Sequence, residues 1–139
     1  MNDYSIKITG PFFARDVQPV IEAAVRDGLQ DAVERGELLL KERARPKPAG
    51  VFLSFAEAQK GKASRGNYSR NINGRVDGEI GRISDGQVVY GPWLEGVSSR
   101  NETTRFKGYH SFRIVAQQLQ NEMPDIMQAH IGRAVKGLN

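Results

Sequence analysis

Residues 88–112 read VVYGPWLEGVSSRNETTRFKGYHSF, and they join the end of a predicted sheet to the start of a predicted helix. The apolar run that opens this stretch stops at a Gly-Pro pair, because proline lacks an amide donor and glycine frees the backbone. Trp93 and Leu94 then return apolar area just before a mostly polar stretch that lasts until Phe112. A polar connection of this length is uncommon in a compact domain and is usually functional or disordered. Because aromatic residues anchor both ends, the stretch predicts an ordered arm over 91–109, without regular secondary structure of its own.

Three short runs upstream of the arm are typical of strands, at 72–76, 79–84 and 87–90. Asp-Gly pairs at 77–78 and 85–86 separate them. Such pairs favour hairpin turns, because both residues tolerate positive φ. The pattern therefore predicts a three-stranded antiparallel meander.

Apolar residues recur at intervals of three and four over 17–33, with charged residues on the opposite face, which predicts a long amphipathic helix. Asp16 is the expected N-cap, and Pro19 lies in the first turn, where its missing donor costs nothing. Two readings of the far end stay open: the helix ends at Gly36, or it continues through 38–44.

The two ends of the chain complete the predicted fold. Alternating apolar residues over 4–8 predict an N-terminal strand. Apolar residues follow helical spacing from Phe112 to Leu138, and Pro124 is expected to kink this helix or to start a second one. The predicted class is α+β, with an N-terminal strand and long helix, a three- to four-stranded antiparallel meander and a kinked C-terminal helix. A length of 139 residues fits one domain, 1–139.

The net charge of +4 is unevenly distributed. Nine cations and two carboxylates lie within 41–75, a net charge of +7, so the remainder of the chain carries −3. Such a stretch attracts nucleic acid or an acidic protein surface, or it is a solvated loop. The part at about 41–66 is predicted to be a basic linker, because two prolines break the preceding helix, and the apolar residues within 51–55 indicate a strand or a short helix. The expected contacts with DNA or an acidic surface are Arg43, Arg45, Lys47, Lys60, Lys62, Arg65 and Arg70.

Residues with catalytic chemistry are few. The two histidines lack partners at metal-ligand spacing, there is no cysteine, and no phosphate-binding glycine loop is present. A small enzyme built on His110, Glu95 and Arg105 is one hypothesis, since imidazole titrates near neutrality. His130 lies on an apolar stripe and is expected to be packed in a core or interface rather than to bind a metal. We therefore expect no enzyme activity, no cofactor and no metal.

The stretch around the arm also resembles a known family. A run of Tyr-Gly-Pro-Trp-Leu-Glu-Gly, a polar loop, Arg-Phe-x-Gly-Tyr and a C-terminal helix is similar to the neck and tail-completion proteins of long-tailed bacteriophages. These are also called head-to-tail connector or minor tail proteins. Upstream, residues 66–72 resemble the family's Gly-x-Leu-x-x-Ser-Ile entry into the sheet, with Tyr68 where an aliphatic residue is usual. The residues that carry the main resemblance are Tyr90, Gly91, Trp93, Glu95, Gly96, Arg105 and Phe106.

This resemblance implies a non-catalytic virion protein of the neck or tail, made in the host cytoplasm. It would assemble as a ring, with a hexamer as the family-based expectation, and join the head connector to the tail tube. The implied partners are head-completion or connector proteins and tail-tube or tail-terminator proteins, with nonspecific contact to genomic DNA and no membrane. The expected assembly residues are Tyr90, Trp93, Glu95, Arg100, Arg105, Phe106 and Tyr109. The alternative is a small nucleic-acid-binding protein that uses the basic 41–75 region.

Overall fold

The computed structural model describes residues 16–44 and 67–138. In chain order the elements are α2 (Gln18–Arg43), α4 (Asn67–Asn71), β1 (Asn73–Asp77), β2 (Ile80–Ser84), α5 (Gly91–Glu95), α6 (Arg100–Thr103) and α7 (Ser111–Lys136). This mixture of helix and strand confirms the α+β class. The predicted strand at 4–8 and nearly all of the basic linker lie outside the described residues.

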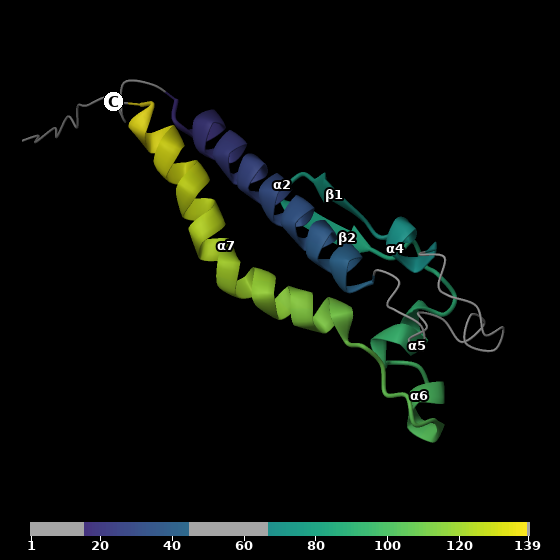
Figure 1. Ribbon diagram of the computed structural model, residues 1–139. Helices are drawn as coiled ribbons and strands as arrows, with labels where there is room; N and C mark the ends of the chain where they lie inside the picture. Colours follow the sequence, from purple (N-terminus) through teal and green to yellow (C-terminus); the bar gives the residue numbers. More distant parts are fainter. Residues whose placement is uncertain (1–15, 45–66, 139) are drawn as a thin grey trace, which may run out of the picture.

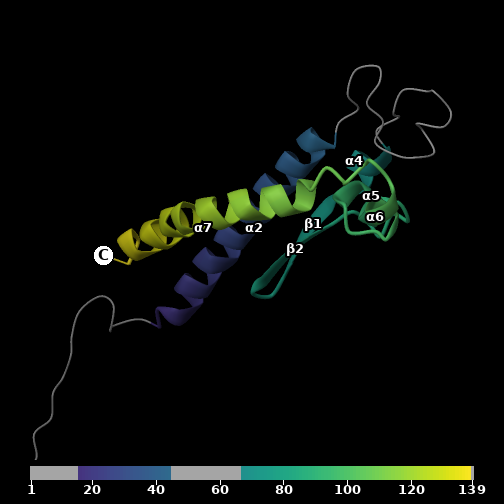
Figure 2. The ribbon, with the colours of Figure 1, turned by 90° about the horizontal axis from the view of Figure 1, so that it is seen from below.

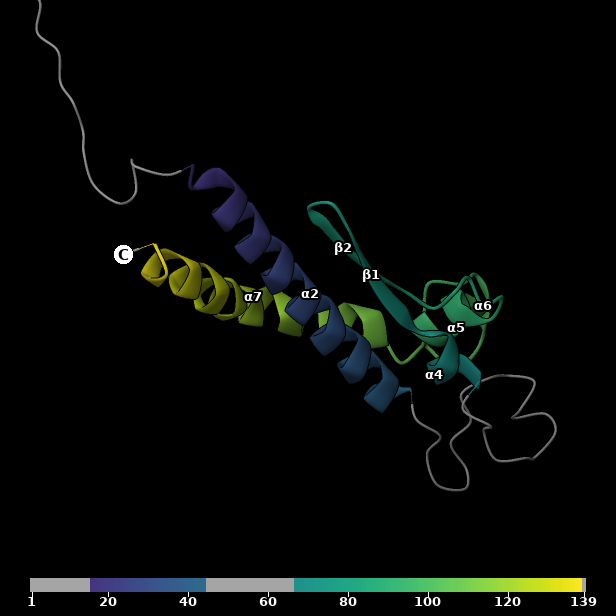
Figure 3. The ribbon, with the colours of Figure 1, turned by 90° about the horizontal axis from the view of Figure 1, so that it is seen from above.

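The helix α2 lies at the centre of the molecule (Figure 1). The helix α7 packs along one side of it in the opposite direction, and the hairpin of β1 and β2 packs along another side. The two long helices cross at an angle, as the views from below and above show (Figures 2 and 3). The short helices α4, α5 and α6 gather at one end, beside the end of the hairpin that is far from its turn.

Small side chains on α2 allow α7 to approach closely. Buried residues recur every four positions along α2: Ala24, Gly28, Ala32, Gly36 and Leu40. A Cβ added to Gly28 would lie 2.7 Å from Met127 Sδ, and one added to Gly36 would lie 2.6 Å from Leu119 Cδ1. Rows of residues spaced by four form the ridges and grooves through which helices pack, so Gly28 marks the contact with α7, and Gly36 lies where α2 meets both α7 and Ile83 of β2. Because this packing offsets the cost of a glycine within a helix, α2 continues through Gly36 and ends at Arg43. Of the two readings left open by the sequence, the longer helix is the one observed.

The start of α2 differs from the prediction by one residue. Val17, rather than Asp16, is the N-cap residue. The Asp16 carboxylate still accepts a hydrogen bond from the Gln18 amide, at 3.1 Å. Its side chain therefore caps the helix from one position further out.

The hairpin presents one face to α2. Gly74 is paired with Ile83 and Val76 with Gly81. Val33 of α2 fills the space over both glycines, because a Cβ on Gly74 or Gly81 would lie 2.3 Å or 2.6 Å from its methyl groups. The opposite face carries Arg75 paired with Arg82. Val33 therefore packs against both strands at their two glycines.

The prediction of a third and a fourth strand is wrong for the described residues, where the sheet has two strands. Residues 86–87 and 89–90 form turns instead. The Gly86 amide donates to Ser84 Oγ at 3.0 Å, and the Gln87 amide donates to an Asp85 carboxylate oxygen, also at 3.0 Å. Such local side-chain acceptors compete with the sheet for backbone donors. The Gly91 amide then donates to the Val88 carbonyl at 2.8 Å, and the chain enters α5.

The predicted kink in the C-terminal helix is confirmed. Pro124 lies inside α7, near the middle of its 26 residues, and the helix bends about midway along its length (Figure 1). A proline inside a helix removes one hydrogen bond and clashes with the preceding turn. The bend lets both halves of α7 follow α2.

The best-buried side chains lie where α2, the hairpin and α7 meet. Leu40, Ile72 and Val115 are each 1% exposed and belong to one apolar cluster with Tyr68 and Leu94. Polar links join α2 to its neighbours further out. Glu37 accepts a hydrogen bond from the Gly74 amide at 2.8 Å and pairs with Lys41. The Lys41 ammonium, with the Gly74 amide, lowers the pKa of the Glu37 carboxyl.

Candidate functional site

The arm predicted at 91–109 is folded around one buried polar residue. Asn101 is 4% exposed and lies in α6. Its side-chain amide donates to the carbonyls of Trp93 at 3.0 Å and Phe106 at 3.1 Å, and its side-chain oxygen accepts from the Ser98 amide at 3.0 Å. One side chain thereby ties three separate points of the arm together. The expectation of an arm without secondary structure is corrected, since α5 and α6 lie within it.

A row of aromatic rings continues this framework. The ring centroids of Trp93 and Phe106 are 4.5 Å apart, and those of Phe106 and Tyr109 are 4.8 Å apart. Tilted and edge-on rings at these separations attract one another beyond simple area burial. The Tyr109 amide donates to the Leu94 carbonyl at 2.7 Å, which closes the arm onto α5. Burial raises the pKa of the Tyr109 hydroxyl.

Two glycines allow the arm to cross itself. Gly96 and Gly108 have φ values of +94° and +96°, in the left-handed region that favours glycine. A Cβ added to Gly108 would lie 2.3 Å from Gly96 Cα, so the backbones touch directly at this crossing. Any other residue at position 108 would strain the backbone and open the crossing.

Glu95 joins the arm to α7. Its two carboxylate oxygens accept hydrogen bonds from the amides of Phe112 and Arg113, both at 3.0 Å. These are amides of the first turn of α7, where donors lack partners within the helix and the helix dipole favours a negative charge. Glu95 therefore serves as a cap supplied from a distant element. Neither His110 nor Arg105 has a hydrogen bond or ion pair to this carboxylate within the described part of the chain.

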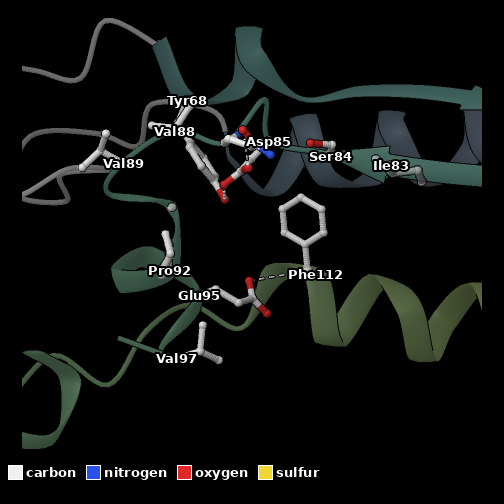
Figure 4. A pocket seen from close by; sticks show the side chains of 12 residues that line it. Tyr68, Ile83, Ser84, Asp85, Val88, Val89, Pro92, Glu95, Val97 and Phe112 are labelled. Atoms are coloured by element: carbon white, nitrogen blue, oxygen red, sulfur yellow. Dashed lines mark hydrogen bonds between the residues drawn. The ribbon is translucent and has the colours of Figure 1, made fainter. Parts of the chain in front are cut away.

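A hollow of about 560 Å³ lies between the end of β2, the turns that follow it, α5 and the start of α7 (Figure 4). We call it the arm hollow. Tyr68 and Asp85 lie on one side of it, and Glu95 and Phe112 lie on the other. The Tyr68 hydroxyl is 3.5 Å from an Asp85 carboxylate oxygen. Burial, followed by the charges of Asp85 and Glu95, raises the pKa of the Tyr68 hydroxyl.

The structure brings together five of the seven predicted assembly residues. Tyr90, Trp93, Glu95, Phe106 and Tyr109 are all partly buried within or beside the arm. The other two, Arg100 and Arg105, are exposed on it. Sequence reasoning missed the buried role of Asn101, for which the only signal was its place in a polar stretch. It also placed Asp85 in a hairpin turn without expecting its contact with the Tyr68 hydroxyl.

The predicted basic contacts are described only in part. Arg43 at the end of α2 and Arg70 in α4 are exposed. Arg45, Lys47, Lys60, Lys62 and Arg65 lie outside the described residues. Whether the basic stretch forms one surface stays a prediction.

Two further expectations concern chemistry. His130 is packed between the long helices, with 14% of its side chain exposed and Nε2 placed 2.6 Å from an Asp31 carboxylate oxygen. Across 16–44 and 67–138, no group of three or more acidic, histidine or cysteine side chains is arranged to hold a metal ion. No helix in these same two ranges is both long and apolar enough to cross a membrane.

Comparison with known proteins identifies no relative: no family model, no curated protein and no solved structure matches this chain.

Proposed function

We propose that this chain is a non-catalytic subunit of the head–tail junction of a long-tailed bacteriophage. It assembles as a ring, expected to be a hexamer, that joins the head connector to the tail tube. Head-completion or connector proteins and tail-tube or tail-terminator proteins are its partners, and the virion neck or tail is its location. The proposal starts from the resemblance of residues 90–106 to that family.

The observation that carries the proposal is an ordered arm whose first part, α5, packs on the apolar cluster through Leu94, whereas its α6 part projects from the body. The helix α6 makes no extensive contact with the other described helices and strands, yet Asn101 and the aromatic row hold it in one conformation. Arg100 and Arg105 are exposed on this arm. A pre-ordered projection loses little conformational entropy when it binds, and arginine is enriched at protein interfaces. Both properties suit a segment that binds a neighbouring subunit.

The first test is the native mass of the purified protein at low and moderate salt. A closed ring supports the proposal. The double substitution Arg100→Ala and Arg105→Ala should then abolish the ring while the circular dichroism spectrum stays unchanged. Arg26→Ala with Arg113→Ala, which removes two exposed arginines from α2 and α7, is the matched control and should assemble normally. A strictly monomeric protein that never enters particles, with particles assembling normally in its absence, would overturn the proposal.

The alternative function is nonspecific binding of nucleic acid through the 41–75 region. It is favoured by one observation: Arg43 and Arg70 are exposed on the two elements that flank the basic linker. Affinity for a short DNA duplex should then fall steeply with salt, because each neutralised phosphate releases counterions. A monomer that binds duplex DNA in this way would favour the alternative, whereas no binding even at low salt would remove it.

A further inference from the structure

The outer face of the hairpin carries two arginines directly opposite each other. Arg75 of β1 is paired with Arg82 of β2, and the inner face of the same strands packs on α2. Both arginines are exposed. Like charges directly across two strands destabilise a hairpin. The pair therefore costs stability in the isolated protein, and an anion bound between the two guanidinium groups would remove that cost.

A hollow of about 750 Å³ lies on this face, and we call it the hairpin hollow. Its lining residues are Asn73, Arg75, Gly81, Arg82, Ile83, Ser84, Gly86 and Gln87. The side chains of five of these residues can donate hydrogen bonds, and none of the eight carries a carboxylate. The arm hollow has the opposite character, since two carboxylates and no cation line it. The hairpin hollow therefore suits an anion.

The two arginines differ in the ion pairs that they make. Arg75 Nε is 2.9 Å from an Asp77 carboxylate oxygen, and the two side chains are 70% and 55% exposed. Such exposed ion pairs contribute little to stability. Arg82 makes no ion pair within the described part of the chain. Arg75 can therefore exchange Asp77 for a ligand, and Arg82 can bind one without breaking an existing ion pair.

We infer that the hairpin hollow binds phosphate groups, which a nucleic-acid strand supplies in a row, through Arg75 and Arg82. A guanidinium group presents parallel donors that match two oxygens of one phosphate. Asparagine, serine and glutamine side chains, which complete the donor set of the hollow, also contact phosphates in nucleic-acid complexes. The volume of about 750 Å³ lies within the roughly 300–1,000 Å³ typical of ligand pockets, so the hollow has room for more than one phosphate.

This site differs from the contacts proposed above. Arg75 is the last residue of the basic 41–75 region, and Arg82 lies outside it. The two arginines meet because the hairpin pairs position 75 with position 82. The inference does not depend on ring formation, because the outer face of the hairpin is exposed on a single chain.

The test is the binding of a short DNA duplex to the whole chain at several salt concentrations. Arg75→Gln with Arg82→Gln removes both charges but keeps polar side chains. Its affinity at about 50 mM salt should fall about tenfold or more, and the plot of log affinity against log salt should become shallower by about 1–2, because one or two phosphate contacts are lost. The matched control, Arg26→Gln with Arg113→Gln, removes two exposed arginines from α2 and α7 and should lose no more than about twofold.

A second variant is expected to strengthen the site, which misfolding could not do. Asp77→Asn removes the carboxylate that pairs with Arg75, so the affinity for the duplex should rise several-fold. All the substituted side chains are exposed, and the circular dichroism spectra of the variants should therefore match that of the unaltered protein.

Two further probes identify the source of the phosphate. Binding of inorganic pyrophosphate that requires both arginines, without binding of the duplex, would support the phosphate site and assign it to a small ligand. Binding of poly-glutamate as tight as that of the duplex would overturn the inference, because the face would then recognise carboxylates. The same duplex affinity in the Arg75 and Arg82 double variant as in its control would overturn it, and so would a failure to bind either phosphate probe.

Discussion

The body and the arm of this molecule are stabilised in different ways. In the body, α2, α7 and the hairpin pack through small and apolar side chains, and Gly28, Gly36 and Val33 mark the points of closest approach. In the arm, one buried amide and one carboxylate hold the chain through backbone hydrogen bonds. The body relies on apolar packing spread over many contacts, whereas the arm combines a row of three aromatic rings with a few hydrogen bonds from Asn101 and Glu95. The body should therefore lose stability as a unit, and the arm should open locally.

The largest effect is expected in the body. Leu40 is 1% exposed, so Leu40→Ala leaves a cavity in the main cluster and should cost about 2–5 kcal/mol of unfolding free energy. Urea denaturation followed by circular dichroism measures this loss. Leu38→Ala is the control, because Leu38 is 48% exposed on the same helix and should change stability by no more than about 0.5 kcal/mol. Equal losses in the two variants would contradict the assigned packing of α2.

The arm should respond next, and locally. Asn101→Ala removes three hydrogen bonds and leaves their partners unpaired, at a cost of about 1–3 kcal/mol. Hydrogen exchange should accelerate over 93–109 while α2 stays protected, and fluorescence of Trp93, the only tryptophan, should shift. Asn121→Ala, on an exposed part of α7, should change neither signal. Unfolding of the whole protein together with the arm would show that the two regions are one cooperative unit.

The junction between the regions should show a smaller loss. Glu95→Gln keeps one acceptor for the first turn of α7 but removes the charge, so we expect a loss of about 0.5–2 kcal/mol, as for other N-terminal caps. Exchange of the first amides of α7 measures it. Glu102→Gln, an exposed change on the arm, is the control. If exchange at the start of α7 were the same in both variants, the cap assigned to Glu95 would be wrong.

The smallest expected effect is a dependence on pH in the body. The pKa of Glu37 is lowered in the folded protein by Lys41 and the Gly74 amide. Its contribution is therefore present above the unfolded pKa, which is near 4.3 for glutamate, and is lost as the pH falls through the lower folded pKa. Because this carboxylate is partly exposed, the contribution should stay under about 1 kcal/mol. Urea midpoints between pH 7 and pH 3 should fall less steeply in Glu37→Gln than in the unaltered protein; parallel curves would exclude this role.

Much of the body was predictable from the sequence alone. The spacing of apolar residues over 17–33 and from Phe112 onward indicates which face of each helix is buried. It therefore predicts both long helices, α2 and α7. Pro124 predicted the bend in α7, because proline cannot donate within a helix. The Asp-Gly pair predicts the hairpin turn at 77–78, whereas Asp77 pairs with Ile80 and the two turn residues are 78 and 79. An Asp-Gly pair indicates a turn but does not fix which position of the turn each of its residues takes.

The candidate site was predictable only in outline. The aromatic residues of the arm marked an ordered segment, and the structure places Trp93, Phe106 and Tyr109 in one row. The predicted third strand does not form, because the side chains of Ser84 and Asp85 accept hydrogen bonds from the backbone amides that a further strand would use. No periodic pattern distinguishes such a local hydrogen bond from the start of another strand.

The sequence by itself determined the long helices, the hairpin and the uneven charge, because each depends on residues close together in the chain. Tertiary structure alone decided the passage of α2 through Gly36, the burial of Asn101 and the use of Glu95 as a cap for α7. The helical cost of Gly36 is offset because side chains of both β2 and α7 fill the space beside it. A buried amide or carboxylate is favourable only when distant backbone groups reach it. These partners come together only after the chain has folded.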